Sequence, residues 1–238
     1  MGRAYEVRKA SIQKTGAAKA KLYSMYAREI YKTAKQKGTE VESNAELKRI
    51  IEKAKKEQVP SDIIKRAIDK VNSGVDESYL SNTYELFGPT GSTIIAECLT
   101  DNVNRTVSDL RTALNKCHCK MGNPGSVSYL YDHNSILSFK GLTEEQVVDI
   151  LIENDLDIID IEIEEDVVTI YGNPLDLLPI KEVLSNNGVE DFILDEVSYL
   201  PKEQIELSKE DNDVFEKLIG MLDEVEDVQN IYHNVKNG

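Results

Sequence analysis

The feature that most constrains this chain is a change of hydrophobic period at Thr100. Before it, residues 93–99 form an apolar run whose length and β-branched content predict a buried strand. After it, apolar side chains recur at steps of three and four residues as far as Cys117, which is the spacing of one helix face. The sequence therefore predicts a strand, a polar turn and a helix that begins near Val103.

The polar turn contains candidate helix caps and one residue that does not fit a capping role. Asp101, Asn102 or Asn104 can offer a side-chain oxygen to the free backbone N–H groups of the first helical turn. Arg105 places a cation near the positive end of the helix dipole, which is electrostatically unfavourable unless another contact compensates for it. Two interpretations stay open: a solvated side chain or salt bridge to a nearby carboxylate, and a contact with a phosphate group or RNA.

Charge is unevenly distributed along the chain. The 238 residues have a net charge of −15. Residues 1–70 contain 18 basic and 9 acidic side chains, a net charge of +9, whereas residues 71–238 contain 10 basic and 34 acidic ones, a net charge of −24. One end is thus expected to attract polyanions and the rest to be repelled by them, so that a nucleic acid would be met in one orientation.

Residues 1–76 are predicted to form a basic arm and a small helical domain. The arm, residues 1–21, has six basic side chains and one acidic residue, Glu6. Helical spacing begins at Leu22, a second helix follows a cap at Ser43 or Asn44, and a third starts with Ser61 as its cap. Three short amphipathic helices with a basic exterior would make an all-α domain.

Two further domains are expected after a turn-rich linker. Residues 134–203 follow the order β-α-β-β-α-β of a ferredoxin-like sandwich. Residues 80–133 plus 204–238 make a middle domain, because a C-terminal helix and strand cannot bury a face alone and most simply complete the sheet begun upstream. The fold class is therefore α+β with three domains: an N-terminal three-helix domain followed by two ferredoxin-like α/β-sandwich domains, the third inserted in the second.

Two local expectations within these domains concern strands. Residues 126–131 are expected to form a strand after a glycine-rich loop. Ile159, Ile161 and Ile163 alternate with acidic residues, which predicts a strand with these isoleucines buried and the acids in water.

Motifs for catalysis, metal binding and membrane insertion are weak or missing in the sequence. The string Cys117-His118-Cys119 contains two of the three cysteines, but a tetrahedral zinc site needs about four ligands from separated pairs. There is no nucleophile elbow or metalloprotease signature, no apolar run of about 18 residues and no apolar signal region. The sequence predicts a cytoplasmic protein that is not an enzyme, with no catalytic residues, no cofactor and no metal.

Several strings, taken together, are similar to a known family. They are Val59-Pro60, Ile64–Ile68, Tyr84–Pro89, Glu97–Thr106, Gly122 and Gly125–Tyr129. Over nearly the whole chain the sequence resembles the YebC/PmpR family of probable transcriptional regulatory proteins. The start, Gly2-Arg3-Ala4-Tyr5, and the ending over residues 228–235 are closer to its YeeN-like branch.

The resemblance implies the same three domains, with the third inserted in the second. It also implies two activities: DNA binding at promoters, and a ribosome-associated role that helps translation through difficult stretches such as consecutive prolines. No presequence precedes the family's start, which favours a bacterial-type cytoplasmic protein.

Three functional hypotheses follow. The first is a non-enzymatic regulator that binds DNA through its basic N-terminal domain, and the second places the same surface on ribosomal RNA and hence on the ribosome. The third, from fold analogy alone, is a small-molecule sensor. We expect a monomer without membrane contact, whose nucleic-acid-binding residues are Arg3, Arg8, Lys9, Lys14, Lys19, Lys21, Arg28, Lys32, Asn102, Asn104, Arg105 and Thr106.

Overall fold

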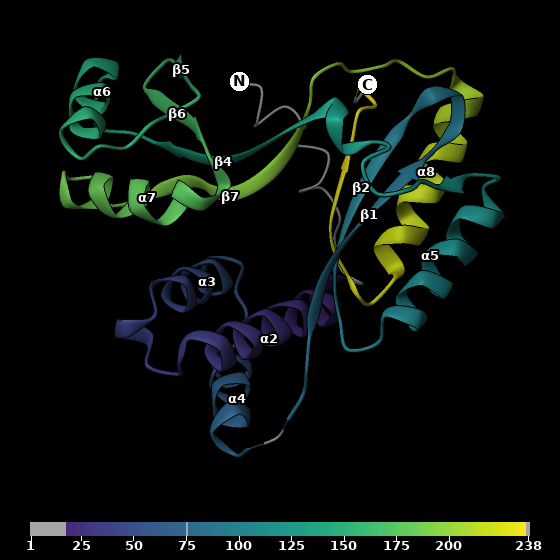
Figure 1. Cartoon of the computed structure of the whole chain (residues 1–238), viewed down its shortest axis with the longest axis horizontal. Coiled ribbons are helices and arrows are strands. Elements are labelled where there is room, and N and C mark those ends of the chain that lie inside the picture. The colour runs from purple at the N-terminus through teal and green to yellow at the C-terminus, as the bar shows by residue number, and fades with distance from the viewer. Residues whose placement is uncertain (1–17, 75, 237–238) are drawn as a thin grey trace. The chain divides into compact units, whose positions relative to one another are not determined.

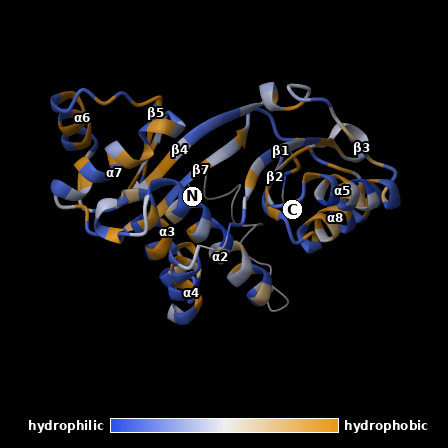
Figure 2. Cartoon of the chain, turned by 60° about the horizontal axis from the view of Figure 1, so that its bottom comes forward, coloured by the Kyte–Doolittle hydropathy of each residue, from blue (hydrophilic) through white to orange (hydrophobic). Residues whose placement is uncertain are grey.

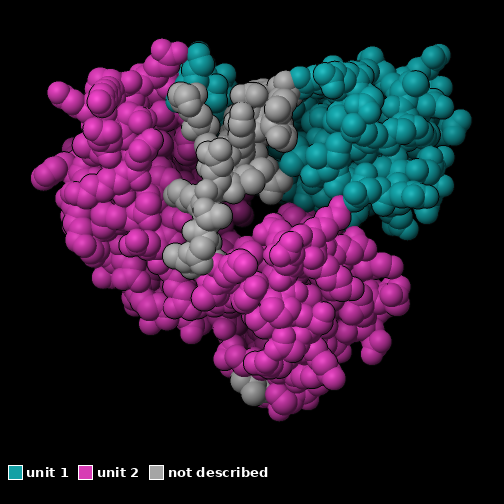
Figure 3. Space-filling model, turned by 180° about the vertical axis from the view of Figure 1, so that it is seen from behind, with its two compact units in different colours: residues 1–13, 128–204, 236–238 teal, residues 14–127, 205–235 magenta. Residues whose placement is uncertain are grey.

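The computed structural model describes residues 18–74 and 76–236 of the chain. They divide into two compact units, one within residues 14–127 and 205–235 and the other around residues 128–204 (Figure 3). Each unit contains hydrophobic clusters of its own. Within the part of the chain that the structure describes, no helix is both long enough and apolar enough to cross a membrane.

The N-terminal domain consists of three helices packed on their apolar faces. They are α2 (Ala18–Lys37), α3 (Ala45–Lys56) and α4 (Ser61–Asn72). Hydrophobic and hydrophilic residues alternate along the helices (Figure 2). Their apolar side chains form one cluster that includes Ile30 and Leu47. Asn44 caps α3, since its Oδ1 accepts a hydrogen bond from the backbone N–H of Leu47 at 3.0 Å. Ser61 is the first helical residue rather than a cap, because the cap position is taken by Pro60.

The middle domain is a four-stranded sheet with two helices on one face (Figure 1). Its elements are β1 (Leu80–Phe87), β2 (Thr93–Thr100), α5 (Val103–Lys116), β3 (Lys120–Met121), α8 (Lys209–Glu224) and β8 (Val228–His233). The strand order is β3-β1-β2-β8, and all neighbours are antiparallel. The C-terminal strand β8 pairs with β2, which confirms that the tail completes the sheet.

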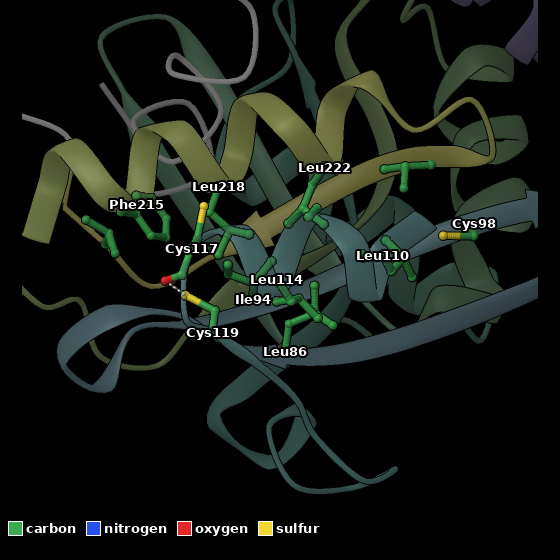
Figure 4. Packing of buried hydrophobic residues seen from close by; sticks show 14 residues of the cluster. Leu86, Ile94, Cys98, Leu110, Leu114, Cys117, Cys119, Phe215, Leu218 and Leu222 are labelled. Atoms are coloured by element: carbon green, nitrogen blue, oxygen red, sulfur yellow. Dashed lines mark hydrogen bonds between the residues drawn. The ribbon is translucent and has the colours of Figure 1, made fainter. Parts of the chain in front are cut away.

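The core of the middle domain lies between this sheet and its helices (Figure 4). Leu110 from α5 and Leu218 and Leu222 from α8 are fully buried against Leu86 and Ile94 of the sheet. Complete removal of such side chains from water stabilises a domain by about 2 kcal/mol each. The stripes of apolar residues on α5 and α8 are therefore core residues.

The strand expected over residues 126–131 is absent, and this prediction was wrong. Residues 128–130 form a 3-10 turn, and the next strand starts only at Tyr131. The backbone N–H groups of Gly125 and Val127 donate instead to the carboxylate of Glu85 on β1, at 2.7 Å for Gly125. Because a side chain takes up these donors, the segment forms a loop.

The inserted domain has the ferredoxin-like order. Its elements are β4 (Tyr131–Phe139), α6 (Glu144–Glu153), β5 (Asp160–Glu164), β6 (Val167–Gly172), α7 (Leu177–Asn186) and β7 (Phe192–Pro201). The antiparallel sheet has the strand order β5-β6-β4-β7. Ile161 packs on the core, but Ile159 and Ile163 are 64% and 48% exposed. The expectation that all three are buried was wrong, because β5 is an edge strand.

Candidate nucleic-acid interface

The string from Thr100 to Thr106 converges on one buried carboxylate, that of Asp227. Asp227 lies between α8 and β8, and its side chain is only 1% exposed. Its Oδ2 accepts hydrogen bonds from the hydroxyls of Thr106 at 2.8 Å and Thr100 at 3.1 Å. Its Oδ1 accepts one from Nη2 of Arg105 at 2.8 Å. A buried charge needs this degree of pairing, since an unpaired one is strongly destabilising.

The junction between β2 and α5 positions these donors. Thr100 ends β2, and its Oγ1 accepts a hydrogen bond from the backbone N–H of Asn102 at 2.9 Å. Asn102 is the cap of α5, because its Oδ1 accepts from the backbone N–H of Arg105 at 3.1 Å. Arg105 also pairs with Asp101 at 2.8 Å. Of the two interpretations of Arg105, the structure contains the salt bridge; a phosphate contact stays a prediction.

The electrostatics of the cluster favour the charged forms. Burial raises the pKa of Asp227, but hydrogen bonds from Arg105, Thr106 and Thr100 and the charge of Arg105 outweigh this effect, so that the pKa lies below its ordinary value. The pKa of Arg105 is raised, first by its hydrogen bond to Asp227 and then by that to Asp101. The pair is therefore ionised at neutral pH.

The helical domain contributes a second arginine to the cluster. Nη1 of Arg28 on α2 lies 2.9 Å from Oδ1 of Asp227, and its Nη2 pairs with Glu226. Lys21, seven residues earlier and therefore on the same helix face, donates to the backbone carbonyl of Asp223 at 2.5 Å. One basic face of α2 thus lies against an acidic turn of the middle domain.

The expected contact residues differ in how the structure uses them. Arg3, Arg8, Lys9 and Lys14 lie outside the described residues. Those with acceptors inside the protein are Lys21, Arg28, Arg105 and Lys32, whose Nζ donates to Oγ of Ser81 at 2.5 Å. Asn102 serves as a cap, and Thr106 is buried on Asp227.

Two of the expected contact residues remain open to solvent. The side chains of Lys19 and Asn104 are exposed and form no hydrogen bond or ion pair with a residue that the structure describes. Lys55 on α3 and Lys65 on α4, which sequence reasoning did not single out, are exposed in the same way. The structure therefore brings Asn102, Arg105 and Thr106 together with Arg28, but it does not gather the expected residues into one surface.

Sequence reasoning missed both buried carboxylates that organise the middle domain. Asp227 is one acid among many near the C-terminus, and its partners lie more than a hundred positions earlier in the chain, so no local pattern identifies it. Glu85 interrupts an otherwise apolar strand, Tyr84–Phe87, and is 8% exposed. That interruption was a usable indication, because an acid on a buried strand needs partners.

The cysteines belong to the core rather than to a metal site. Cys98, Cys117 and Cys119 are all buried, and Sγ of Cys119 donates to the carbonyl of Cys117 at 3.2 Å (Figure 4). Burial raises the pKa of the Cys98 thiol to about 12. Among residues 18–74 and 76–236, no group of three or more His, Cys, Asp or Glu side chains could hold a metal ion.

These features define a class of protein. It is a three-domain α+β chain in which a basic helical domain pairs through Arg28 with the buried carboxylate of Asp227 in an acidic sandwich, and a second sandwich is inserted in the first.

Comparison with known proteins agrees with this description. Residues 3–74 match the family model described as "TACO1/YebC protein N-terminal domain", and residues 79–235 match "TACO1/YebC second and third domain". The chain belongs to the TACO1/YebC family.

Relatives of similar length support the assignment. A "Probable transcriptional regulatory protein" of Acholeplasma laidlawii is 49% identical, covering 99% of this chain and 98% of the relative. One from Alteromonas mediterranea is 42% identical, covering 98% of each chain. The crystal structure of a conserved hypothetical protein from Aquifex aeolicus has a TM-score of 0.73 at 30% identity, covering 93% of this chain and 92% of that one. The family is thus one of proteins named as regulators, while membership of the YeeN-like branch stays a prediction.

Proposed function

We propose that this chain is a regulatory protein that acts by binding nucleic acid, and that it binds DNA through its basic N-terminal part. The observation that carries the proposal is the separation of charge, +9 over residues 1–70 against −24 over the remainder. A polyanion is attracted to one end of such a molecule and repelled by the other. The relatives' names as transcriptional regulatory proteins support binding rather than catalysis.

The contacts that we propose are phosphate contacts. They come from the arm residues Arg3, Arg8, Lys9 and Lys14 and from exposed lysines without an ion pair to a described residue, Lys19, Lys55 and Lys65. Lys21, Arg28 and Lys32 contribute less, because their charges already meet acceptors in the protein. Contacts of this kind position a protein on a duplex but carry little sequence information.

A second, smaller contact is proposed at the start of α5. The side chain of Arg105 is 41% exposed although it pairs with Asp227, and Asn104 beside it faces solvent. Both can therefore reach a phosphate or sugar without breaking the Asp227 cluster. We propose that the protein acts as a cytoplasmic monomer in this role.

The test is the salt dependence of binding of the full chain to a labelled DNA duplex. Replacing Arg8, Lys9, Lys14 and Lys19 by alanine is expected to reduce the slope of log affinity against log salt by about 0.9 for each phosphate that the variant no longer neutralises. The matched control replaces four exposed lysines of the acidic part, Lys116, Lys120, Lys209 and Lys217, and should leave the slope unchanged. Equal effects of the two quadruple variants would reject the N-terminal part as the contact surface.

Sedimentation of the endogenous protein with ribosomes, at low and high salt and with nuclease, distinguishes DNA from ribosomal RNA as the target. Salt-sensitive migration with ribosomes, in a protein that shows no preference for a promoter fragment over competitor DNA, would replace the transcriptional proposal by a role in translation. A protein that stays away from ribosomes but selects a promoter fragment would support it.

A further inference from the structure

A cavity of about 390 Å³ lies in the helical domain, where the linker from α4 to β1 passes over α2 and α4. This volume is within the range of about 300–1,000 Å³ that is usual for small-ligand sites. Its charged and aromatic lining consists of Arg28, Tyr31, Arg66, Lys70, Glu77 and Tyr79. No function assigned above uses this cavity.

The lining combines an apolar floor with aromatic and cationic side chains. Ala27, Ile63 and Ala67 contribute to the floor. The rings of Tyr31 and Tyr79 meet edge to face with their centroids 5.8 Å apart. Such a lining suits a flat aromatic group that carries a negative charge.

Cations stand close to both rings. Cζ of Arg28 lies 5.9 Å from the centroid of the Tyr79 ring, and Nζ of Lys70 lies 5.7 Å from that of Tyr31. Tyr79 is half-buried, so that part of its ring borders the cavity. A ligand that stacks on Tyr79 would therefore find guanidinium and ammonium groups within reach of its anionic part.

The linker is held in place by hydrogen bonds around Glu77. Its carboxylate accepts from Nζ of Lys70 at 2.5 Å and from the hydroxyl of Tyr79 at 2.8 Å, and its backbone N–H donates to the hydroxyl of Tyr31 at 3.0 Å. The negative charge of Glu77 is thus paired with Lys70, and the two rings are oriented before a ligand arrives.

Arg66 is the cation that can turn toward an incoming anion. It lines the cavity, and its side chain is 77% exposed. Its partner, Asp62, lies one helical turn away and is itself 58% exposed. Such surface pairs contribute little to stability, so a phosphate can replace the carboxylate at small cost.

We propose that this cavity binds one nucleoside monophosphate unit, with its base against Tyr79 and its phosphate at Arg66. This inference rests on the proposed function of nucleic-acid binding, and it specifies that the protein recognises an unstacked nucleotide. A base in a duplex has both faces covered by its neighbours, whereas an unstacked base offers a face to an aromatic side chain. The unit can belong to a single strand or be a free nucleotide.

The test titrates the full-length protein with four probes: adenosine and uridine 5′-monophosphates, an eight-nucleotide single strand, and the duplex of the same sequence. We expect saturable mononucleotide binding and tighter binding of the single strand than of the duplex. If the strand binds no more tightly than the mononucleotides, the natural occupant is a free nucleotide. That result would support the cavity as a binding site and show that its ligand does not come from a nucleic-acid strand.

Two matched pairs of variants locate the binding. Arg66→Ala and Lys116→Ala each remove one exposed cation from a helix, but Lys116 neither lines the cavity nor belongs to the proposed contact surface. Tyr79→Leu and Tyr129→Leu each remove one ring, and Tyr129 is 65% exposed outside the helical domain. Tyr79→Leu is expected to weaken single-strand and mononucleotide binding about tenfold, as is typical for loss of one stacked base. Arg66→Ala is expected to weaken both by about the same factor, because a charge-assisted contact with the phosphate is lost. Tyr79→Phe keeps the ring and should retain binding, which separates stacking from the hydrogen bond to Glu77.

Failure of this inference is distinguishable from failure of the proposed function. If Arg66→Ala weakens duplex and single-strand binding alike and leaves mononucleotide binding unchanged, binding is purely electrostatic and the cavity is not a site, while nucleic-acid binding stands. If no probe binds at low salt, both are overturned. Because Arg66 is exposed, its variant tests the cavity even if Tyr79→Leu fails to fold.

Discussion

The two sandwich domains have equivalent sheets but differ in how the chain enters them. In the inserted domain β4 is central and pairs with β6 and β7, and β5 lies at the edge beyond β6. In the middle domain the equivalent central strand is β2, and it pairs with β8 as β4 pairs with β7. The edge strand β3 corresponds to β5. The strand that corresponds to β6 is β1, which comes first in the chain of its domain instead of third. The same antiparallel arrangement is thus reached by two orders of the elements.

The domains also differ in what their interiors contain. The middle domain buries two carboxylates, Glu85 and Asp227, each surrounded by donors from distant segments. Among the described residues of the inserted domain, no acidic residue is buried to that extent. There Asp195, whose side chain is 10% exposed, pairs with Lys181, which lies only 14 positions earlier in a continuous chain. Where segments far apart in sequence must meet, a buried carboxylate specifies which of them do.

The largest effect is expected from a mutation in the apolar core of the inserted domain. Phe139 on β4 is fully buried, so Phe139→Ala should destabilise the inserted domain by about 4 kcal/mol through poorer packing and a cavity. Urea unfolding followed by hydrogen exchange should show the loss in residues 131–201. An equal loss of protection in β1 and β2 would contradict the independence of the two cores.

The next largest effect is expected from loss of a buried carboxylate in the middle domain. Asp227→Ala leaves Arg105 and Arg28 without their buried partner and should destabilise the middle domain by about 3 kcal/mol. The loss should appear in chemical denaturation of the full chain, with Asp223→Ala as a control, because that carboxylate is 44% exposed and lies 3.9 Å from Lys21. If the two variants unfold at the same denaturant concentration, the cluster does not organise the domain.

Acidification should remove the same contribution without a mutation. The pKa of Asp227 is lower in the folded than in the unfolded state, so its stabilisation is complete above the unfolded value of about 3.9 and is lost as pH falls through the folded pKa. The stability difference between wild type and Asp227→Asn should therefore be constant near neutral pH and shrink below pH of about 4. A difference that grows on acidification would mean that the carboxylate is not held in its charged form.

A smaller effect concerns the loop held by Glu85. Glu85→Gln replaces an acceptor of two backbone N–H groups by an amide with only one oxygen, which should cost about 2 kcal/mol. Amide exchange at Gly125 and Val127 should accelerate, while Thr83→Ser at an exposed position of the same strand as Glu85 serves as a neutral surface change. Unchanged exchange at both amides would show that the loop is held by other contacts.

The smallest effect is local to the inserted domain. Thr143 and Gln146 form a capping box at the start of α6, with hydrogen bonds of 3.3 and 2.9 Å. Thr143→Ala should cost about 1 kcal/mol, and Thr143→Ser should restore most of it because the hydroxyl remains. Thermal unfolding of the three proteins measures both steps.

What could be predicted from the sequence follows the range of the interactions involved. Asn44 and Asn102 were among the expected helix caps, because the partners of such caps lie three residues away. The order of elements along the inserted domain and the role of the tail followed from periodicity and from the need to cover a sheet face. The contacts of the candidate site could not be predicted in this way, because the pairing of Arg105 and Arg28 with Asp227 depends on the assembled fold.

Two failures have the same physical cause. The strand expected over residues 126–131 gives way to the Glu85 carboxylate, which lies some forty positions earlier. Ile159 and Ile163 carry a pattern that suits burial, but their exposure is decided by the position of β5 at the sheet edge. Periodicity reports what a segment is able to bury, and only the neighbouring elements decide whether it does so.

The insertion within the middle sheet has a consequence for how the protein is made. During synthesis, β1 and β2 leave the ribosome long before β8, the strand that pairs with the other side of β2. The inserted domain is contiguous, so it is able to fold while the middle sheet still waits for its last strand. Until then β2 presents an unpaired edge rich in β-branched residues, which is a template for association between nascent chains. If synthesis slows or stops after residue 204, this edge stays unpaired for longer, and aggregation of the incomplete chains is therefore expected to increase.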